Sequence, residues 1–300
     1  MSYPFLSDLL RDLTGVDIPL PMPMFGLFVA LAVVVAAYCM KLELKRMYEL
    51  GLVGPARVRE RVAHGNAKGV MVDKAVPPQD VVSDFAMVVL FAGIVGARIF
   101  HILEHSDQFI LDPASLIFTR SGLSIFGGLI FGTLAGIYCV RRWQLPVRPL
   151  LDATAPAMMI GYAVGRIGCQ VAGDGDWGIA ANMALKPAWL PTWFWAQTYD
   201  NNIVGEVIAL PGVYPTPMYE TMVGLFCFAI LWGQRRHAFK MGWLFSVYLM
   251  LAGVERLLVE QIRVNPVLNV MGVMATQAQM IAVTLIVLGL AGAVLLRRPR

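Results

Sequence analysis

Apolar residues along this chain gather in runs close to 20 residues long. A helical run of that length crosses the hydrocarbon core of a bilayer, which is about 30 Å thick. The pattern predicts seven membrane-spanning helices, at residues 24–40, 82–103, 123–140, 151–169, 217–234, 241–259 and 278–296. We therefore expect an all-α polytopic membrane protein in which residues 1–300 form a single membrane domain.

Composition supports a membrane protein. Of the 300 residues, 58% are hydrophobic and only 15% are charged, and the mean hydropathy is +0.65. A soluble domain carries about 25% charged residues, because its surface must be wetted. The four cysteines show no C-x-x-C spacing, so they suggest neither a zinc site nor a disulfide framework. We expect no metal, no cofactor and no nucleic-acid partner.

The basic residues predict an orientation. Most Lys and Arg outside the apolar runs lie in residues 41–80, in the two loops after the third and fifth runs, and in the C-terminal tail. The opposite side carries only Arg11, Arg120 and Lys186. Because basic loops stay in the cytoplasm, the N-terminus is expected outside and the C-terminus inside.

The longest outer segment, residues 170–216, is rich in tryptophan and contains Gly173-Asp174-Gly175-Asp176. Tryptophan favours the membrane–water interface. We expect a small outer cap that lies on the bilayer.

Arginines inside apolar runs are the strongest functional signal. Arg98, Arg166 and Arg256 lie within or at the end of such runs, and Arg263 follows closely. Each would cost about 2.5–3.5 kcal/mol at the centre of a membrane helix. One explanation is self-neutralisation, since Glu260 lies one turn after Arg256. The other is an anionic lipid headgroup, because a guanidinium group donates two parallel hydrogen bonds to phosphate.

Several segments resemble the prolipoprotein diacylglyceryl transferase family. Gly165-Arg166-Ile167-Gly168 resembles its G-R-x-G-N signature, and Arg256-x-x-x-Glu260 resembles its R-x-x-x-E. Further matches, in order, are Gly96-Ala97-Arg98, Gly122-Leu123-Ser124-Ile125-Phe126-Gly127-Gly128, Tyr214-Pro215-Thr216-Pro217-Met218-Tyr219-Glu220, and Thr276 with Gln279. The resemblance covers almost the whole chain.

The resemblance implies a function and a site. The family moves the diacylglyceryl group of phosphatidylglycerol onto the lipobox cysteine of a secreted preprotein in the bacterial inner membrane, and glycerol phosphate leaves. By resemblance, Arg166 and Arg256 hold the phosphate, Glu260 orients Arg256, and either Asp174 or Asp176 replaces a family glutamate. The remaining expected substrate contacts are Arg98, Arg263, Tyr219, Glu220, Gly127 and Gly128.

Three departures from the family leave alternatives open. The family histidine before Gly-Gly is Phe126, its asparagine after R-x-G is Cys169, and a tyrosine of its first helix is Phe25. Beside the family's own reaction, these departures leave two alternatives: a divergent paralogue that uses the same lipid with another acceptor, and a non-catalytic phospholipid-binding or transport protein. His101 or His105 is a candidate proton acceptor, and Cys169 a candidate nucleophile.

A different class of enzyme matches one short motif. His101-Ile102-Leu103-Glu104-His105 fits the H-x-x-E-H pattern of zinc proteases, which places two histidines one turn apart beside a glutamate base. A catalytic zinc also needs a third ligand, for which Asp107 is a candidate. Because the match is five residues long, this is the weakest of the alternatives.

Overall fold

A computed structural model describes residues 2–20, 22–64, 67–113, 124–270 and 273–299 of the chain. The chain divides into two compact units, residues 1–38 with 151–300 and residues 39–150. Arg120, Gly122 and Leu123, which entered the predictions above, lie outside the described residues. The single membrane domain stays a prediction.

A helix overlaps each predicted span, and of the described residues in these spans only Ser124, Met241, Gly242 and Leu296 lie outside a helix. These helices are α2 (Met24–Glu49), α3 (Val82–Glu104), α6 (Ile125–Arg142), α7 (Val147–Ala172), α9 (Thr216–Gln234), α10 (Trp243–Glu260) and α11 (Gln277–Leu295). Among the described residues, four segments are long and apolar enough to cross a membrane by length and composition: Met24–Glu49, Pro78–Glu104, Ile125–Arg142 and Gln277–Leu295. That α7, α9 and α10 also cross it stays a prediction.

The outward faces of the four apolar segments carry large hydrophobic side chains. Val34, Phe91, Leu129 and Val287 are each more than half exposed. In water such surfaces would drive aggregation, whereas lipid chains cover them without cost. Exposure of apolar residues on these helices is therefore consistent with a bilayer as their solvent.

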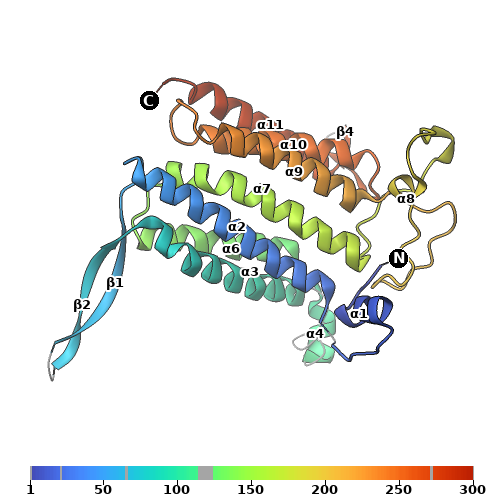
Figure 1. The fold of residues 1–300 in the computed structure, drawn as a ribbon, viewed down its shortest axis with the longest axis horizontal. Helices are drawn as coiled ribbons and strands as arrows, with labels where there is room; N and C mark the ends of the chain where they lie inside the picture. Colours follow the sequence, from blue (N-terminus) through green and yellow to red (C-terminus); the bar gives the residue numbers. More distant parts are fainter. Residues whose placement is uncertain (1, 21, 65–66, 114–123, 271–272, 300) are drawn as a thin grey trace. The chain divides into compact units, whose positions relative to one another are not determined.

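Small residues set the helix contacts of the larger unit. Helices α10 and α11 lie side by side (Figure 1). A methyl group at Gly253 would lie 2.6 Å from the carbonyl oxygen of Ala282, and one at Gly168 would lie 2.7 Å from Cβ of Phe28. Glycine thus brings α10 close to α11 and α7 close to α2, as is common between membrane helices.

A buried carboxylate fixes the start of α10 against α7. Asp152 is fully buried and accepts hydrogen bonds from the backbone nitrogens of Gly242, at 2.8 Å, and Phe245, at 3.0 Å. It satisfies two of the free N–H groups at the helix start. A core follows between α7, α9 and α10, with the buried residues Ala155, Met159, Cys227, Leu231 and Leu244. The opposite ends of the three helices, which carry the candidate site, are thereby held together.

The segment between α7 and α9 folds back onto the end of α10. It contains the short helices η2 (Met183–Leu185) and α8 (Thr192–Trp195). The Ile179 nitrogen donates to the carbonyl oxygen of Ile262 at 2.8 Å, and the Gly178 nitrogen to that of Tyr214 at 2.9 Å. Trp189 and Trp193 are largely exposed. That this segment is an outer cap stays a prediction.

The smaller unit contains β1 (Ala56–His64), β2 (Ala67–Val76), η1 (Pro78–Val81), α3, α4 (Ser106–Leu111) and α6. Helices α3 and α6 pack closely, because a methyl group at Gly96 would lie 2.5 Å from the carbonyl oxygen of Gly127. The Arg57 nitrogen donates to the carbonyl oxygen of Trp143 at 3.0 Å, which ties the first strand to the end of α6.

The prediction of an all-α fold is wrong in two places. Strands β1 and β2 form an antiparallel ribbon within the basic segment 41–80 (Figure 1). Strands β3 (Val267–Val270) and β4 (Val273–Thr276) form a second hairpin before α11. In β1, Val58 and Val62 alternate with arginines, a period-two pattern with β-branched residues that favours a strand. This pattern contains no long apolar run, so the hydropathy of the sequence alone does not predict the strand.

Candidate functional site

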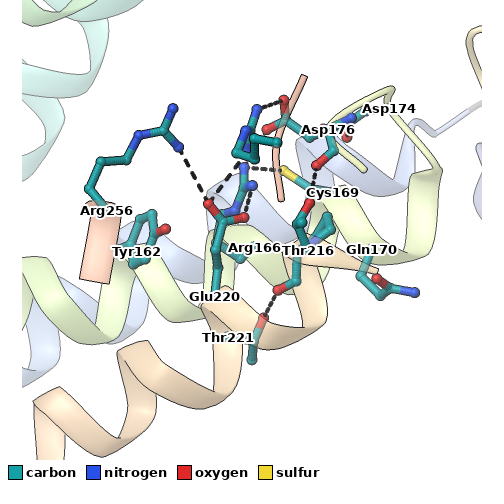
Figure 2. Close-up of polar contacts among 12 residues, drawn as sticks. Tyr162, Arg166, Cys169, Gln170, Asp174, Asp176, Thr216, Glu220, Thr221 and Arg256 are labelled. Atoms are coloured by element: carbon teal, nitrogen blue, oxygen red, sulfur yellow. Dashed lines mark hydrogen bonds and ion pairs between the residues drawn. The ribbon is translucent and has the colours of Figure 1, made fainter. Parts of the chain in front are cut away.

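Three helices of the larger unit, together with the segments that follow two of them, bring ionisable side chains to one place. Arg166 lies on the last turns of α7, and Glu220 lies in the second turn of α9. Arg256 and Glu260 lie on the last turns of α10, and Arg263 follows that helix. Figure 2 shows Glu220 between Arg256 and Arg166.

Arg166 forms two ion pairs through the two arms of its guanidinium group. Nη1 pairs with Oδ2 of Asp176, and Nη2 pairs with Oε2 of Glu220. The Glu220 side chain is 1% exposed and that of Arg166 is 12% exposed. Charges this deeply buried are tolerated only when they are paired and hydrogen-bonded.

Arg263 repeats this arrangement from the other side. Its Nη2 lies 2.7 Å from Oδ1 of Asp176, and its Nη1 lies 3.5 Å from Oε1 of Glu220. Two arginines and two carboxylates thus form a closed ring, which joins α7, α9 and the segments that follow α7 and α10. Thr216 supports the ring by donating to the backbone carbonyl oxygen of Asp176 at 2.6 Å.

Arg256 extends the ring toward a second carboxylate. Its Nη1 lies 3.7 Å from Oε1 of Glu220, and its Nη2 lies 2.9 Å from Oε2 of Glu260. The pair within one helix that the sequence predicts is therefore present. It does not act alone, because Glu220 faces all three arginines.

Glu260 is itself held by neighbouring donors. Asn265 Nδ2 lies 2.9 Å from each Glu260 oxygen, and Thr276 Oγ1 donates to Oε1 at 2.5 Å. Thr276 also begins α11 and forms a capping box with Gln279. The polar turn before the last helix thus holds Glu260, which pairs with Arg256.

The two candidate aspartates occupy different environments. Burial alone would raise the pKa of the Asp176 carboxyl, but the guanidinium groups of Arg166 and Arg263 outweigh it and lower that pKa below its usual range. Asp174 instead accepts a bond from the Asp176 backbone nitrogen at 3.3 Å, so it shapes the turn. The structure therefore places Asp176 among the arginines, and Asp174 beside them.

Two further predicted residues of this unit have structural partners. Cys169 is buried, and its Sγ lies 3.5 Å from Nη1 of Arg166. The Tyr219 hydroxyl donates to the carbonyl oxygen of Phe194 at 2.6 Å, which fixes the segment between α7 and α9. A direct lipid contact for Tyr219 stays a prediction.

The other predicted residues lie in the smaller unit. Arg98 and His101 are half-buried residues of α3, and His105 follows that helix. Gly127 packs against Gly96, and Gly128 lies near Gly93, so both glycines serve the contact between α3 and α6. The roles of all five residues toward a substrate stay predictions.

The sequence reasoning missed a buried pair that lies beside the arginines of the larger unit. The Tyr162 hydroxyl donates to Oε1 of Glu255 at 2.9 Å, and Glu255 is 4% exposed. A signal was present, because Tyr162 lies one turn before Arg166 and Glu255 adjoins Arg256. Tyr162 shares a helix face with Arg166 but carries no charge, so a pattern of buried charges does not indicate it.

Comparison with known proteins gives the family. A family model described as prolipoprotein diacylglyceryl transferase matches residues 14–295. The phosphatidylglycerol–prolipoprotein diacylglyceryl transferase of Leptospira interrogans is 31% identical over 208 residues, which cover 61% of this chain and 62% of that protein. That of Halalkalibacterium halodurans is 30% identical over 211 residues and 70% of each chain.

A third relative agrees with these two. The enzyme of the same name from Corynebacterium glutamicum is 31% identical over 203 residues, which cover 62% of this chain and 60% of that protein. The alignments with the Leptospira and Corynebacterium proteins thus span about three fifths of those relatives. Because the family model covers nearly the whole sequence, this chain belongs to the prolipoprotein diacylglyceryl transferase family.

Proposed function

We propose that this chain transfers the diacylglyceryl group of phosphatidylglycerol to a cysteine thiol of a secreted preprotein and releases glycerol phosphate. The observation that carries the proposal is the convergence of Arg166, Arg256 and Arg263 on the buried Glu220. The names of the relatives supply the donor and the acceptor.

Arg256 is the arginine best suited to contact the lipid phosphate. Its side chain is 27% exposed, whereas those of Arg166 and Arg263 are 12% and 13% exposed. The two deeper arginines hold Asp176 and Glu220 in place. Their Nε atoms are buried without a hydrogen-bond partner among the described residues, so each keeps a donor to offer when a phosphate displaces a carboxylate.

In the proposed reaction, negative charge develops on the phosphate group that the arginines contact. The thiol sulfur bonds to the glyceryl carbon next to the phosphate, and the bond between that carbon and the phosphate oxygen breaks. Negative charge grows on the departing phosphate, and guanidinium donors stabilise it. A phosphate monoester has a second pKa near 6, so the leaving group can take the thiol proton. The reaction then does not require a histidine at Phe126.

An apolar hollow beside the arginines suits an acyl chain. It has a volume of about 470 Å³ and is lined by Leu257, Ala275, Gln279, Met280 and Val283. Leu257 follows Arg256 in the sequence. Ala275 precedes Thr276, which bonds Glu260, and Gln279 shares a capping box with Thr276. A phosphate at Arg256 would leave one lipid chain facing this hollow.

The same proposal includes a membrane topology. Seven spans, with the N-terminus outside and the C-terminus in the cytoplasm, would place the ends of α7 and α10 and the segment 170–216 at the outer face of the bacterial inner membrane. Phosphatidylglycerol and a secreted preprotein are both accessible from that face. Labelling of single introduced cysteines from either side of the membrane tests this arrangement.

The function is tested with the purified protein in vesicles of phosphatidylglycerol and a lipobox-cysteine peptide. We expect Arg256→Ala to lower the release of glycerol phosphate about 100-fold or more, the usual loss when one transition-state donor is removed. Arg11→Ala is the matched control, because Arg11 lies on α1 (Leu6–Thr14) and its side chain is 59% exposed. Full activity of Arg256→Ala in folded protein would refute the assignment.

A paralogue with another acceptor remains the second candidate, because Phe126 and Cys169 replace a histidine and an asparagine of the family pattern. Lipid-dependent release of glycerol phosphate that needs a different thiol or hydroxyl compound would favour it. No release with any acceptor, together with tight phosphatidylglycerol binding, would favour a lipid-binding protein.

A further inference from the structure

A cluster of potential metal ligands lies at the end of α3, within the smaller unit. His101, Glu104 and His105 each offer one nitrogen or oxygen atom, and these atoms lie within 4.8 Å of one another. The helix brings them together because Glu104 and His105 follow His101 by three and four residues, the spacings that share a helix face. The proposed transfer reaction leaves this combination of residues unused.

Two of the three side chains already have a second partner that orients them. Nδ1 of His105 lies 3.0 Å from the carbonyl oxygen of His101. A proton on Nδ1 donates to that oxygen and leaves the Nε2 lone pair free. The Ser124 hydroxyl donates to Oε1 of Glu104 at 2.7 Å, and Oε2 has no hydrogen-bond partner among the described residues. Metal-binding histidines and carboxylates typically have such outer partners, which fix the ligand atom and its direction.

The ligand atoms lie within 4.8 Å of one another and must move closer together to hold one metal ion. Zinc bonds to histidine nitrogen at about 2.0–2.1 Å and to carboxylate oxygen at about 2.0–2.2 Å, with tetrahedral geometry. Ligand atoms then lie about 3.3 Å apart. Glu104 and His105 are exposed, so small side-chain rotations can close the difference. The two imidazole rings are tilted by 49° with centroids 4.4 Å apart, so they are not stacked face to face.

We propose that His101, Glu104 and His105 form a three-ligand site for one divalent transition-metal ion, with zinc preferred by the donor set. Two imidazoles and one carboxylate are an established zinc donor set, and the fourth position would hold water. This proposal differs from the zinc-protease alternative, in which the glutamate must remain an unbound base. Here Glu104 is a ligand tied to Ser124, so the site binds metal without a protease reaction. It also departs from the expectation of no metal.

The metal would fasten the junction of α3 and α6. Ser124 is the residue that precedes α6, and its nitrogen donates to the carbonyl oxygen of Ala97 on α3 at 3.1 Å. An ion held by His101, Glu104 and His105 would restrain the end of α3 and, through Glu104, the start of α6. The expected consequence is a metal-dependent rise in thermal stability, because an ion that binds only the folded state stabilises it.

The test uses full-length protein in detergent, stripped with a chelator and titrated with ZnCl₂ by calorimetry. We expect uptake of one ion per chain. His101→Gln and His105→Gln should each weaken binding about 100-fold, and Ser124→Ala about tenfold, the usual range for outer partners. His64→Gln, a histidine outside the cluster, is the matched control and should bind as the unmodified chain does.

A second readout separates a specific site from loose binding. Co²⁺ in a tetrahedral site with imidazole ligands gives visible absorption bands, which we expect in the unmodified chain and not in His101→Gln/His105→Gln. The proposal is overturned if no saturable uptake occurs, or if the double variant keeps full affinity. It is also overturned if uptake disappears in Cys169→Ser instead, because Cys169, Asp174 and Asp176 are the other described group of potential ligands.

Discussion

The arginine network of the larger unit and the β1–β2 ribbon of the smaller unit contain the same chemical groups in opposite environments. In the ribbon, Arg59 pairs with Asp73 at 3.2 Å and Lys74 pairs with Glu60 at 3.0 Å, and every one of these side chains is more than half exposed. In the network, Glu220 is 1% exposed and faces three arginines. Equal distances therefore do not imply equal energies.

Desolvation explains the difference. Exposed ion pairs contribute about 0–1 kcal/mol, because water and salt screen them. In a buried network the cost of removing the charges from water is already spent, so the loss of one partner leaves an uncompensated charge. The ribbon can vary its charges freely, whereas the network must keep all its members together.

The largest effect is expected for Glu220→Ala. It leaves Arg166, Arg256 and Arg263 without their shared carboxylate, so we expect the free energy of unfolding to fall by about 3–5 kcal/mol. Thermal unfolding in detergent measures the change. Glu60→Ala in the ribbon is the control, with a change below about 1 kcal/mol. Similar losses in both variants would break the comparison.

A smaller loss is expected for Thr276→Val. The substitution removes the hydroxyl that donates to Glu260 and that caps the start of α11, and it keeps the shape of the side chain. A hydrogen bond to a charged group contributes about 1.5–3 kcal/mol, and we expect a destabilisation in that range. Thr284→Val is a suitable control, because the Thr284 hydroxyl donates only to its own helix, at the Met280 carbonyl oxygen. An unchanged Thr276→Val protein would show that Glu260 does not depend on this contact.

The lowered pKa of Asp176 predicts an acid-side effect. A carboxyl whose pKa is lower in the folded state contributes stability above its unfolded pKa, about 3.9, and loses it as pH falls through the folded value. Asp176→Asn should therefore be less stable than the unmodified chain at pH 6, and the difference should shrink below pH about 4. Melting temperatures of both proteins over this pH range measure it. A difference that does not change with pH would mean that the charge of Asp176 is not what stabilises the network.

The smallest effect is expected for Arg59→Ala. We expect a change of about 0–1 kcal/mol that fades further at high salt, because the pair with Asp73 is exposed. Unfolding curves at low and high ionic strength measure it. A loss as large as that of Glu220→Ala would show that exposure does not decide the contribution.

Most of the helices and several site residues could be predicted from the sequence. The apolar runs located helices α2, α3, α6, α7, α9, α10 and α11, because an apolar run of about 20 residues is typical of a helix long enough to cross a bilayer. That α7, α9 and α10 cross one stays a prediction. The motif segments pointed to Arg166, Arg256, Glu260 and Glu220, and the structure brings these four together. The β1–β2 ribbon was missed, since its alternation is short and charged.

The sequence by itself determined the family, the helices and the need to compensate buried arginines, because these follow from hydropathy, local spacing and motif residues. Only the tertiary structure decided which acids provide that compensation. In the structure Asp176, and not Asp174, pairs with Arg166 and Arg263. Glu220 pairs with three arginines, and Tyr162 donates a hydrogen bond to Glu255. These pairings connect residues up to 93 positions apart in the chain, and they depend on how helix ends meet in space, which no local pattern encodes.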